Sequence, residues 1–111
     1  MQTHRVILLS RDGGVVDSSE RGMNRAVTIA GPLCHSTDFL AKELHPFPEP
    51  EIDDYLLLLD CGGNTISTFS KHCSRLVPPV FAFRENAVTG EVVMAEIRRE
   101  ETELAAMDFW K

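Results

Sequence analysis

The sequence predicts an all-β fold, built mainly as an antiparallel sheet or distorted barrel, with a short helix near residues 36–44 and a C-terminal helix. Three features predict it. Short runs rich in Val, Ile, Leu and Phe alternate with clusters of Gly, Pro, Asp and Asn, which is typical of strands joined by turns. The run Tyr55–Leu59 is apolar throughout, which is typical of a strand covered on both faces. Near the end of the chain, acidic residues precede a spaced apolar stripe, as in an amphipathic helix.

The expected strands follow from the apolar runs, and in chain order they are residues 5–10, 26–30, 55–60, 64–69, 80–84 and 91–98. Between the first two, Asp12-Gly13-Gly14 indicates a turn, because Asp and Gly accept the backbone angles of turns. The charged residues 17–25 indicate an exposed loop. Since Tyr55–Leu59 does not alternate, we expect it to form the central strand.

The first helix is expected directly after a glycine- and proline-containing segment. Ser36 is a favourable N-cap residue type, and Phe39, Leu40 and Leu44 would share the apolar side of a helix. Pro46 would end this helix, because proline cannot continue it. The prolines that follow then lead, as a loop, into the central strand.

The C-terminal helix is expected to begin near Glu100, where a cluster of acids favours the positive end of a helix dipole. Leu104, Met107 and Trp110 recur at three-residue steps, so they form one apolar stripe that needs a surface to pack on. We interpret the acids of this segment as the solvated face of the helix rather than as a catalytic carboxylate pair.

Length and composition limit the classes of protein. A chain of 111 residues is large enough to bury a core without disulfides, and we expect one domain over residues 1–111. The formal charge is −6 and the cations are scattered, which disfavours binding to nucleic acid. No apolar run approaches the roughly 20 residues that span a bilayer. We therefore expect a cytoplasmic protein with neither nucleic acid nor membrane as a partner.

The cysteines indicate neither a metal site nor a disulfide framework. Cys34, Cys61 and Cys73 are odd in number, and their spacings contain no closely spaced chelating pair of the zinc-binding kind. Immediate neighbours such as Cys34 and His35 point to opposite faces of a strand, which also argues against a nucleophile and its base. We expect reduced thiols and no metal.

Three segments resemble one enzyme family. Residues 31–40, GPLCHSTDFL, resemble the G-P-x-C-x-S-x-D-x-L active-site segment of the ornithine, diaminopimelate and arginine decarboxylases, the fold-type III family that uses pyridoxal phosphate. Residues 60–79 resemble the glycine turn of that family with the strand and loop that follow it. Residues 97–104 resemble its closing strand end and helix start. The resemblance extends from about residue 26 to the C-terminus.

The resemblance implies the C-terminal β domain of such a decarboxylase, a lyase of amino-acid metabolism in polyamine or lysine biosynthesis. In that family an N-terminal (β/α)₈ barrel carries the Schiff-base lysine and the phosphate site, and this sequence contains no match to it. Pyridoxal 5′-phosphate is therefore implied for the complete enzyme, whereas this chain alone holds no cofactor and is not active. The implied partners are a homodimer mate or a decarboxylase barrel domain or subunit, and a small amino-acid substrate. A non-catalytic interaction module that pairs with a decarboxylase subunit is the alternative.

The resemblance also implies four site residues. Cys34 would be the catalytic cysteine, presented across a dimer interface, although residue type alone favours a buried structural cysteine. His35 and Asp38 would bind the substrate. His35 stands where the family has an acid for a distal ammonium group, so a different distal group is possible, and Asp38 could equally cap the short helix. Asn64 would contact the cofactor in place of a family tyrosine, or serve the turn after Gly62-Gly63.

Overall fold

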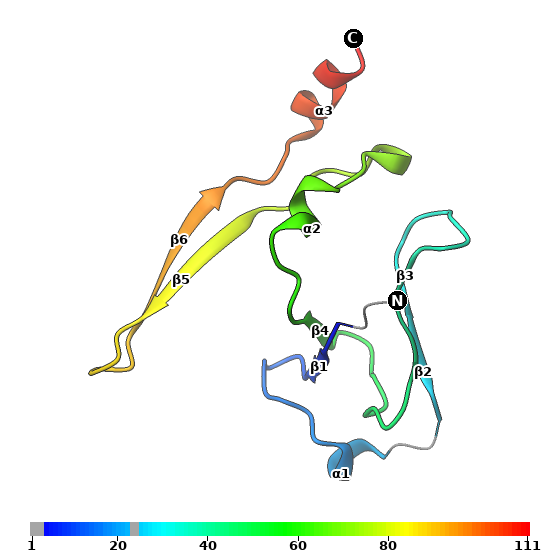
Figure 1. Cartoon of the computed structure of the whole chain (residues 1–111), viewed down its shortest axis with the longest axis vertical. Helices are drawn as coiled ribbons and strands as arrows, with labels where there is room; N and C mark the ends of the chain where they lie inside the picture. The colour runs from blue at the N-terminus through cyan, green and yellow to red at the C-terminus, as the bar shows by residue number, and fades with distance from the viewer. Residues whose placement is uncertain (1–3, 23–24) are drawn as a thin grey trace. The chain divides into compact units, whose positions relative to one another are not determined.

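The computed structural model describes residues 4–22 and 25–111. The chain divides into two compact units, Met1–Thr68 and Phe69–Lys111, which are described separately as the N-terminal unit and the C-terminal unit. Strands are antiparallel in both units, and each strand pairs with one neighbour to make three two-stranded sheets within the described residues (Figure 1). The all-β class is therefore confirmed, together with the helix at the C-terminus.

The N-terminal unit contains two of these strand pairs. β1 (Val6–Leu9) pairs with β4 (Tyr55–Leu58), with Ile7 opposite Leu57. β2 (Val27–Ala30) pairs with β3 (Phe39–Leu44), with a bulge on each side of the Ile29 and Ala41 pair. Two short helices complete the unit, α1 (Ser18–Arg21) and α2 (Asn64–Ser67).

A small apolar core lies in the N-terminal unit. Leu8 on β1 is its most buried side chain, at 2% exposure. Leu8 accepts a backbone hydrogen bond from Val16 at 3.0 Å, which brings the segment after the Asp12-Gly13-Gly14 turn back against β1. Gly13 has a φ of 84°, so the predicted turn is present. The core comprises Leu8, Val16 and Phe47, against which Val6, Val27 and Leu44 pack.

An ion pair joins α1 to the segment before β4. Arg21 on α1 binds the buried Asp54 carboxylate, and the same carboxylate accepts the Glu51 N–H at 2.8 Å. The Glu51 N–H lowers the pKa of Asp54, and the hydrogen bond and charge of Arg21 lower it further. Residues 17–25, expected as a loop, thus include one helical turn that is capped by the Asp17 carboxylate.

The C-terminal unit contains one hairpin flanked by helical turns. β5 (Val80–Glu85) pairs with β6 (Val92–Arg98), and Phe83 lies opposite Met94. η1 (His72–Ser74) precedes the hairpin, and α3 (Glu103–Phe109) follows it. The Thr102 side chain accepts the Ala105 N–H at 3.2 Å and so caps α3. The helix begins at Glu103, three residues after the expected start near Glu100.

The Glu101 carboxylate ties two segments of the C-terminal unit together. One oxygen binds the Lys71 ammonium group, and the other accepts the Val77 N–H at 3.1 Å. The Glu101 N–H in turn donates to the Val77 carbonyl at 2.9 Å. Lys71, and after it the Val77 N–H, lower the pKa of Glu101. The loop before β5 is thereby fastened to the start of α3.

Two sequence predictions are wrong. The helix expected near residues 36–44 is instead β3, because this segment pairs with β2 and its side chains alternate, with Ala41 buried between the exposed Leu40 and Lys42. Ser36 is therefore not a helix cap. The strand expected at residues 64–69 instead begins with α2, where the Thr65 N–H donates to the Gly62 carbonyl at 3.1 Å. In both cases a local apolar pattern shorter than two helical turns did not distinguish helix from strand.

The expected covering of Tyr55–Leu59 on both faces is also absent from this chain. Within the described residues β4 pairs with β1 alone, and Tyr55, Leu56 and Leu57 are exposed. The other predicted strands are present, with ends that differ by one or two residues from those expected. Among the described residues, the core cluster of the N-terminal unit includes Leu8 of β1 and no side chain of β4.

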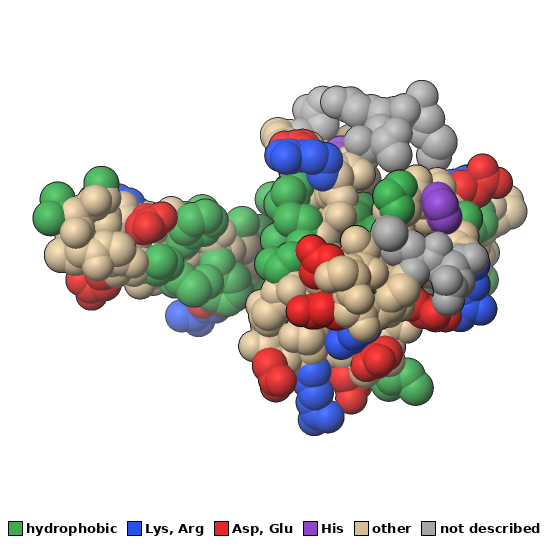
Figure 2. Space-filling model, turned by 90° about the horizontal axis from the view of Figure 1, so that it is seen from below, with side chains coloured by type: hydrophobic (Ala, Val, Ile, Leu, Met, Phe, Trp, Pro, Cys, Tyr) green, Lys and Arg blue, Asp and Glu red, His purple; other side chains and the backbone are tan. Residues whose placement is uncertain are grey.

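The β5–β6 hairpin, which is the narrow segment at the left of Figure 2, also carries exposed apolar side chains. Phe81, Phe83, Val92 and Met94 share one face of the hairpin, since opposite residues and residues two apart point the same way. All four are exposed, and Phe83 reaches 74%. No helix within residues 4–22 and 25–111 has the length and apolar character that crossing a membrane requires.

Candidate functional site

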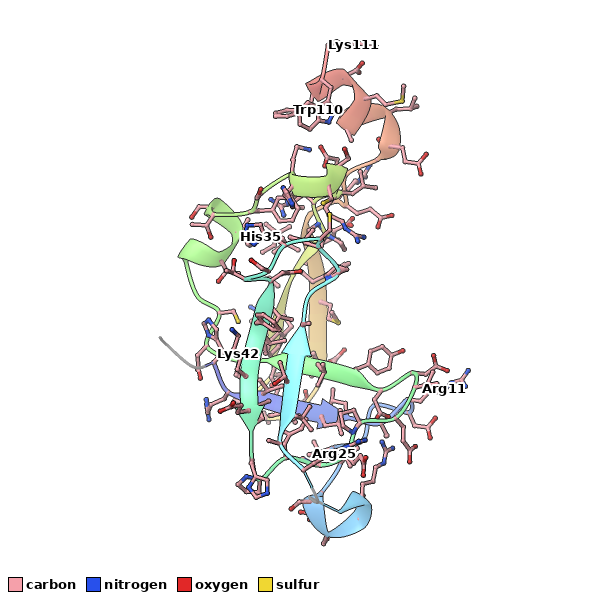
Figure 3. The ribbon with its side chains drawn as sticks, turned by 90° about the vertical axis from the view of Figure 1, so that its right-hand side faces the viewer. Arg11, Arg25, His35, Lys42, Trp110 and Lys111 are labelled. Atoms are coloured by element: carbon pink, nitrogen blue, oxygen red, sulfur yellow. The ribbon has the colours of Figure 1, made fainter. Side chains whose placement is uncertain are left out.

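The candidate site is the loop that joins β2 to β3, residues 31–38. Figure 3 shows His35 in this loop, beyond the ends of the two strands. The Gly31 N–H donates to the Asp38 carbonyl at 2.9 Å and so closes the base of the loop. Further along, the His35 N–H donates to the Leu33 carbonyl at 2.9 Å, and the Asp38 N–H donates to the His35 carbonyl at 3.1 Å. The loop is therefore a hydrogen-bonded turn and not a free excursion of the chain.

Cys34 lies in the middle of this loop and is exposed. The alternative of a buried structural cysteine is therefore wrong for this position. Cys61, by contrast, is half-buried, and its thiol donates to the Leu59 carbonyl at 3.6 Å. An exposed thiol on a defined loop can meet a partner molecule, which a core thiol cannot.

His35 is fixed by the residue two positions later. The Thr37 N–H donates to His35 Nδ1 at 3.3 Å, and the Thr37 hydroxyl lies 2.8 Å from the same atom. A backbone N–H can only donate, so Nδ1 is an acceptor, and the neutral ring carries its proton on Nε2. The imidazole thus presents an N–H donor, whereas a carboxylate at this position would present an acceptor.

Asp38 is half-buried at the base of the loop, where its carboxylate accepts the Leu33 N–H at 2.8 Å. The alternative role as a helix cap is wrong, because no helix follows and the carboxylate instead bonds backward into its own loop. The Asp38 side chain also lies against Gly31. A Cβ atom at Gly31 would be 2.5 Å from Asp38 Cγ and closer still to both carboxylate oxygens, so the loop has no room for one.

Asn64, expected to contact the cofactor, begins α2. Its side chain lies outside the part of the chain that the structure describes. The three other predicted site residues, Cys34, His35 and Asp38, are brought together in the one loop. Sequence reasoning missed Gly31 and Thr37. A signal for Thr37 was available, because Thr two residues after a loop histidine can turn back to bond it.

Pyridoxal phosphate is held covalently as a Schiff base with a lysine, so the surroundings of the three lysines bear on whether this chain could hold it. Lys42 Nζ lies 4.0 Å from the centre of the Phe39 ring. Lys71 pairs with Glu101, and Lys111 pairs with Asp108 at 2.7 Å. Each of the three lysines therefore has a local partner, and none stands in a glycine-rich phosphate cradle. These surroundings do not mark any of the three lysines as a Schiff-base residue.

Comparison with protein-family models matches residues 1–62 to the pyridoxal-dependent decarboxylase, C-terminal sheet domain. The matched segment is more than half of the chain and contains all the strands of the N-terminal unit together with the Cys34 loop. It ends before Asn64 and before the C-terminal unit, whose segments near residues 72–79 and 97–104 are outside the match. Comparisons with curated proteins and with solved structures gave no match.

Proposed function

Because the chain belongs to the family of pyridoxal-dependent decarboxylase C-terminal sheet domains, we propose that it supplies the Cys34 loop to the active site of an amino-acid decarboxylase. In this proposal the loop reaches the site across a dimer interface, and the chain alone is inactive. The observation that carries the proposal is the exposure of Cys34 on a loop closed by its own hydrogen bonds. Because such a loop is already ordered, it can place a thiol in the pocket of a neighbouring subunit without an additional entropy cost for ordering the loop on binding.

The proposed chemical role of Cys34 is proton donation. Pyridoxal phosphate, bound by the barrel of a complete enzyme, supplies the electron sink that allows the α-carboxyl group to leave as CO₂. Cys34 Sγ–H then donates its proton to the α-carbon of the substrate, and the sulfur keeps the electron pair of the S–H bond as a thiolate. Because the Cys34 side chain is exposed, solvent can return the proton once the product has left.

His35 shapes the proposed substrate preference. With Nδ1 accepting from Thr37, the neutral ring carries its proton on Nε2, and in the proposed complete site His35 acts as a donor to the distal end of a substrate side chain. The Asp38 carboxylate is directed into the loop toward Leu33. A substrate whose side chain ends in an acceptor, such as a carboxylate or an amide, suits this loop better than one that ends in an ammonium group.

The exposed apolar residues of β4 support docking against a barrel domain. Tyr55, Leu56 and Leu57 lie on a strand whose composition is that of a buried one. The second candidate function is a non-catalytic module that binds a decarboxylase subunit, and the same exposed residues favour it. The two differ in whether Cys34 reaches a reacting substrate.

The test is a chimera in which this chain follows the barrel of an ornithine or diaminopimelate decarboxylase. We expect CO₂ release from at least one amino acid in a panel, and we expect Cys34→Ala to lower kcat about a hundredfold, the usual size of a lost general acid. Cys73→Ala, which removes an exposed cysteine outside the family match, is the matched control. A chimera that dimerises and binds cofactor but works equally well without Cys34 would favour the non-catalytic module.

A further inference from the structure

We propose that Asp38 and Gly31 form a positioning pair, in which the Asp38 carboxylate lies over the side-chain-free face of Gly31 and sets the backbone that carries Cys34 and His35. Asp38 in this view is a positioning residue and not a group that touches the substrate. The structural part concerns this chain alone, and its consequence for catalysis rests on the proposed function of Cys34.

Asp38 contacts the loop through three separate atoms. Its carbonyl accepts the Gly31 N–H at 2.9 Å, its N–H donates to the His35 carbonyl at 3.1 Å, and its carboxylate accepts the Leu33 N–H at 2.8 Å. The first bond closes the base of the loop, and the other two end on either side of Cys34. A single residue therefore fixes the backbone both before and after the cysteine.

The carboxylate bond is the one of the three that depends on the Asp38 side chain. Leu33 lies five residues before Asp38 and outside β2 and β3, so its N–H takes no part in the strand pairing and needs a local acceptor. A charged acceptor strengthens such a bond relative to a neutral one. Loss of the carboxylate would leave the Leu33 N–H without this acceptor in a half-buried position.

Gly31 is required by the position of that carboxylate. A Cβ at residue 31 would overlap with the Asp38 side chain, whose Cγ would be 2.5 Å away. The carboxylate oxygen that accepts the Leu33 N–H would lie 2.2 Å from the added Cβ, so the Asp38 side chain cannot move aside and keep its bond. Gly31→Ala should therefore have the same effect on the Leu33 N–H as removal of the carboxylate itself.

The same arrangement reaches His35. The Phe39 N–H donates to the Thr37 carbonyl at 2.8 Å, next to Asp38, and Thr37 in turn bonds to His35 Nδ1. A backbone shift at Asp38 moves Thr37 with it, because the two residues are adjacent. The positioning pair thus controls both the thiol and the imidazole of the loop.

The test is nuclear magnetic resonance on the full 111-residue chain without cofactor or substrate. In the unsubstituted chain we expect a scalar coupling across the hydrogen bond between Leu33 nitrogen and Asp38 Cγ. Asp38→Ala and Gly31→Ala should both raise the hydrogen-exchange rate of the Leu33 amide roughly tenfold, the loss expected for one charge-assisted hydrogen bond. Both should also shift the Cys34 resonances. Asp38→Asn, which keeps an acceptor oxygen but loses the charge, should restore part of the protection.

Two matched control variants distinguish the loss of this one hydrogen bond from a general loss of stability. Gly62→Ala adds a Cβ at a glycine where nothing lies within 4 Å, and Asp12→Ala removes an exposed acid from another turn of the same unit. Neither should change exchange at Leu33. The proposal is overturned if the unsubstituted chain lacks the coupling, or if Asp38→Ala leaves Leu33 exchange within twofold while the Leu8 amide stays protected. If a variant unfolds, the coupling in the unsubstituted chain decides alone.

In the chimera, Asp38→Ala should lower kcat through Cys34 and raise KM through His35, and it should cost nothing further once both Cys34 and His35 are already alanine. If Asp38 itself bound the substrate, Asp38→Ala would still raise KM in that double-alanine background. These outcomes separate the two proposals. If Cys34→Ala leaves the activity of the chimera intact, the proposed function fails, while the scalar coupling between Leu33 and Asp38 still tests the positioning pair. If that coupling is absent and Cys34→Ala abolishes activity, only the positioning pair fails.

Discussion

The two hairpins of this chain are built alike and end in different environments. In the β2–β3 hairpin the paired residues Ile29 and Ala41 are buried, and a backbone hydrogen bond closes the loop at its base. β5 and β6 form a longer ladder with one register shift between Val80 and Phe81, yet Phe83 and Met94, which are paired across it, are 74% and 64% exposed. A long backbone ladder therefore does not make a buried sheet. The first hairpin has a core within its own unit, whereas the second presents an apolar face for another surface to cover.

The largest expected difference between the two hairpins is in their dependence on core packing. Leu8→Ala removes the most buried side chain of the core against which β2 and β3 lie, and it should lower the free energy of unfolding of the N-terminal unit by about 3 kcal/mol. Phe83→Ala should cost less than about 0.5 kcal/mol, because an exposed side chain loses little on truncation. Urea titration followed by amide exchange in β1 and β6 measures the two separately. Equal losses of unfolding free energy in Leu8→Ala and Phe83→Ala would contradict the expected difference between the two hairpins.

A second test of the comparison is self-association. The apolar face of the β5–β6 hairpin should make the chain associate, and the opposed pair Phe83→Glu with Met94→Lys should reduce the association constant about tenfold or more while keeping a favourable cross-strand pair. Sedimentation velocity over a concentration series reports this. Ile52→Glu, which changes an isolated side chain that is 94% exposed, is the matched control and should have little effect. An unsubstituted chain that sediments as a monomer throughout would remove the argument for a missing partner.

The smallest expected effect is a pH dependence confined to the C-terminal unit. Lys71 and the Val77 N–H lower the pKa of Glu101, so this carboxylate contributes stability above its unfolded pKa of about 4.3 and loses that contribution as the pH falls through its lower folded pKa. Lys71→Met removes a group that lowers the pKa of Glu101, so the protonation of Glu101 should move to higher pH. The amide resonance of Val77, followed as a function of pH, measures this transition. Lys111→Met, which breaks an exposed pair with Asp108, should leave that transition unchanged. An identical shift in both variants would indicate a general charge effect instead.

The sequence predicted much of the fold because most strands carry their own signal. The runs around Val6–Leu9 and Val92–Arg98 are rich in β-branched residues and are bounded by turn residues, and both became strands. Residues 39–44 were mistaken for a helix because Phe39, Leu40 and Leu44 also fit a helical face. The extended form is favoured by pairing with β2. That partner strand lies on the other side of a loop, so the local residue pattern carries no information about the pairing.

The candidate site was predictable in part for a similar reason. The GPLCHSTDFL segment located Cys34, His35 and Asp38 by resemblance, and the family match covers all three. The role of Asp38 was not predictable, because it depends on the direction of the carboxylate, which points to the Leu33 N–H. The sequence placed Gly31 in the motif without indicating its role, since the need for a missing Cβ becomes visible only when the atom that would meet it is placed.

The sequence by itself therefore determined the β class, the terminal helix and the family, because residue type and spacing act locally and survive in a linear pattern. Only the tertiary structure decided that residues 36–44 pair as a strand and that the acid of the motif faces its own loop. It also showed that a strand with the composition of a buried one stays uncovered in this chain. These three outcomes depend on contacts between distant residues, or on their absence, and such contacts depend on the packing available in three dimensions.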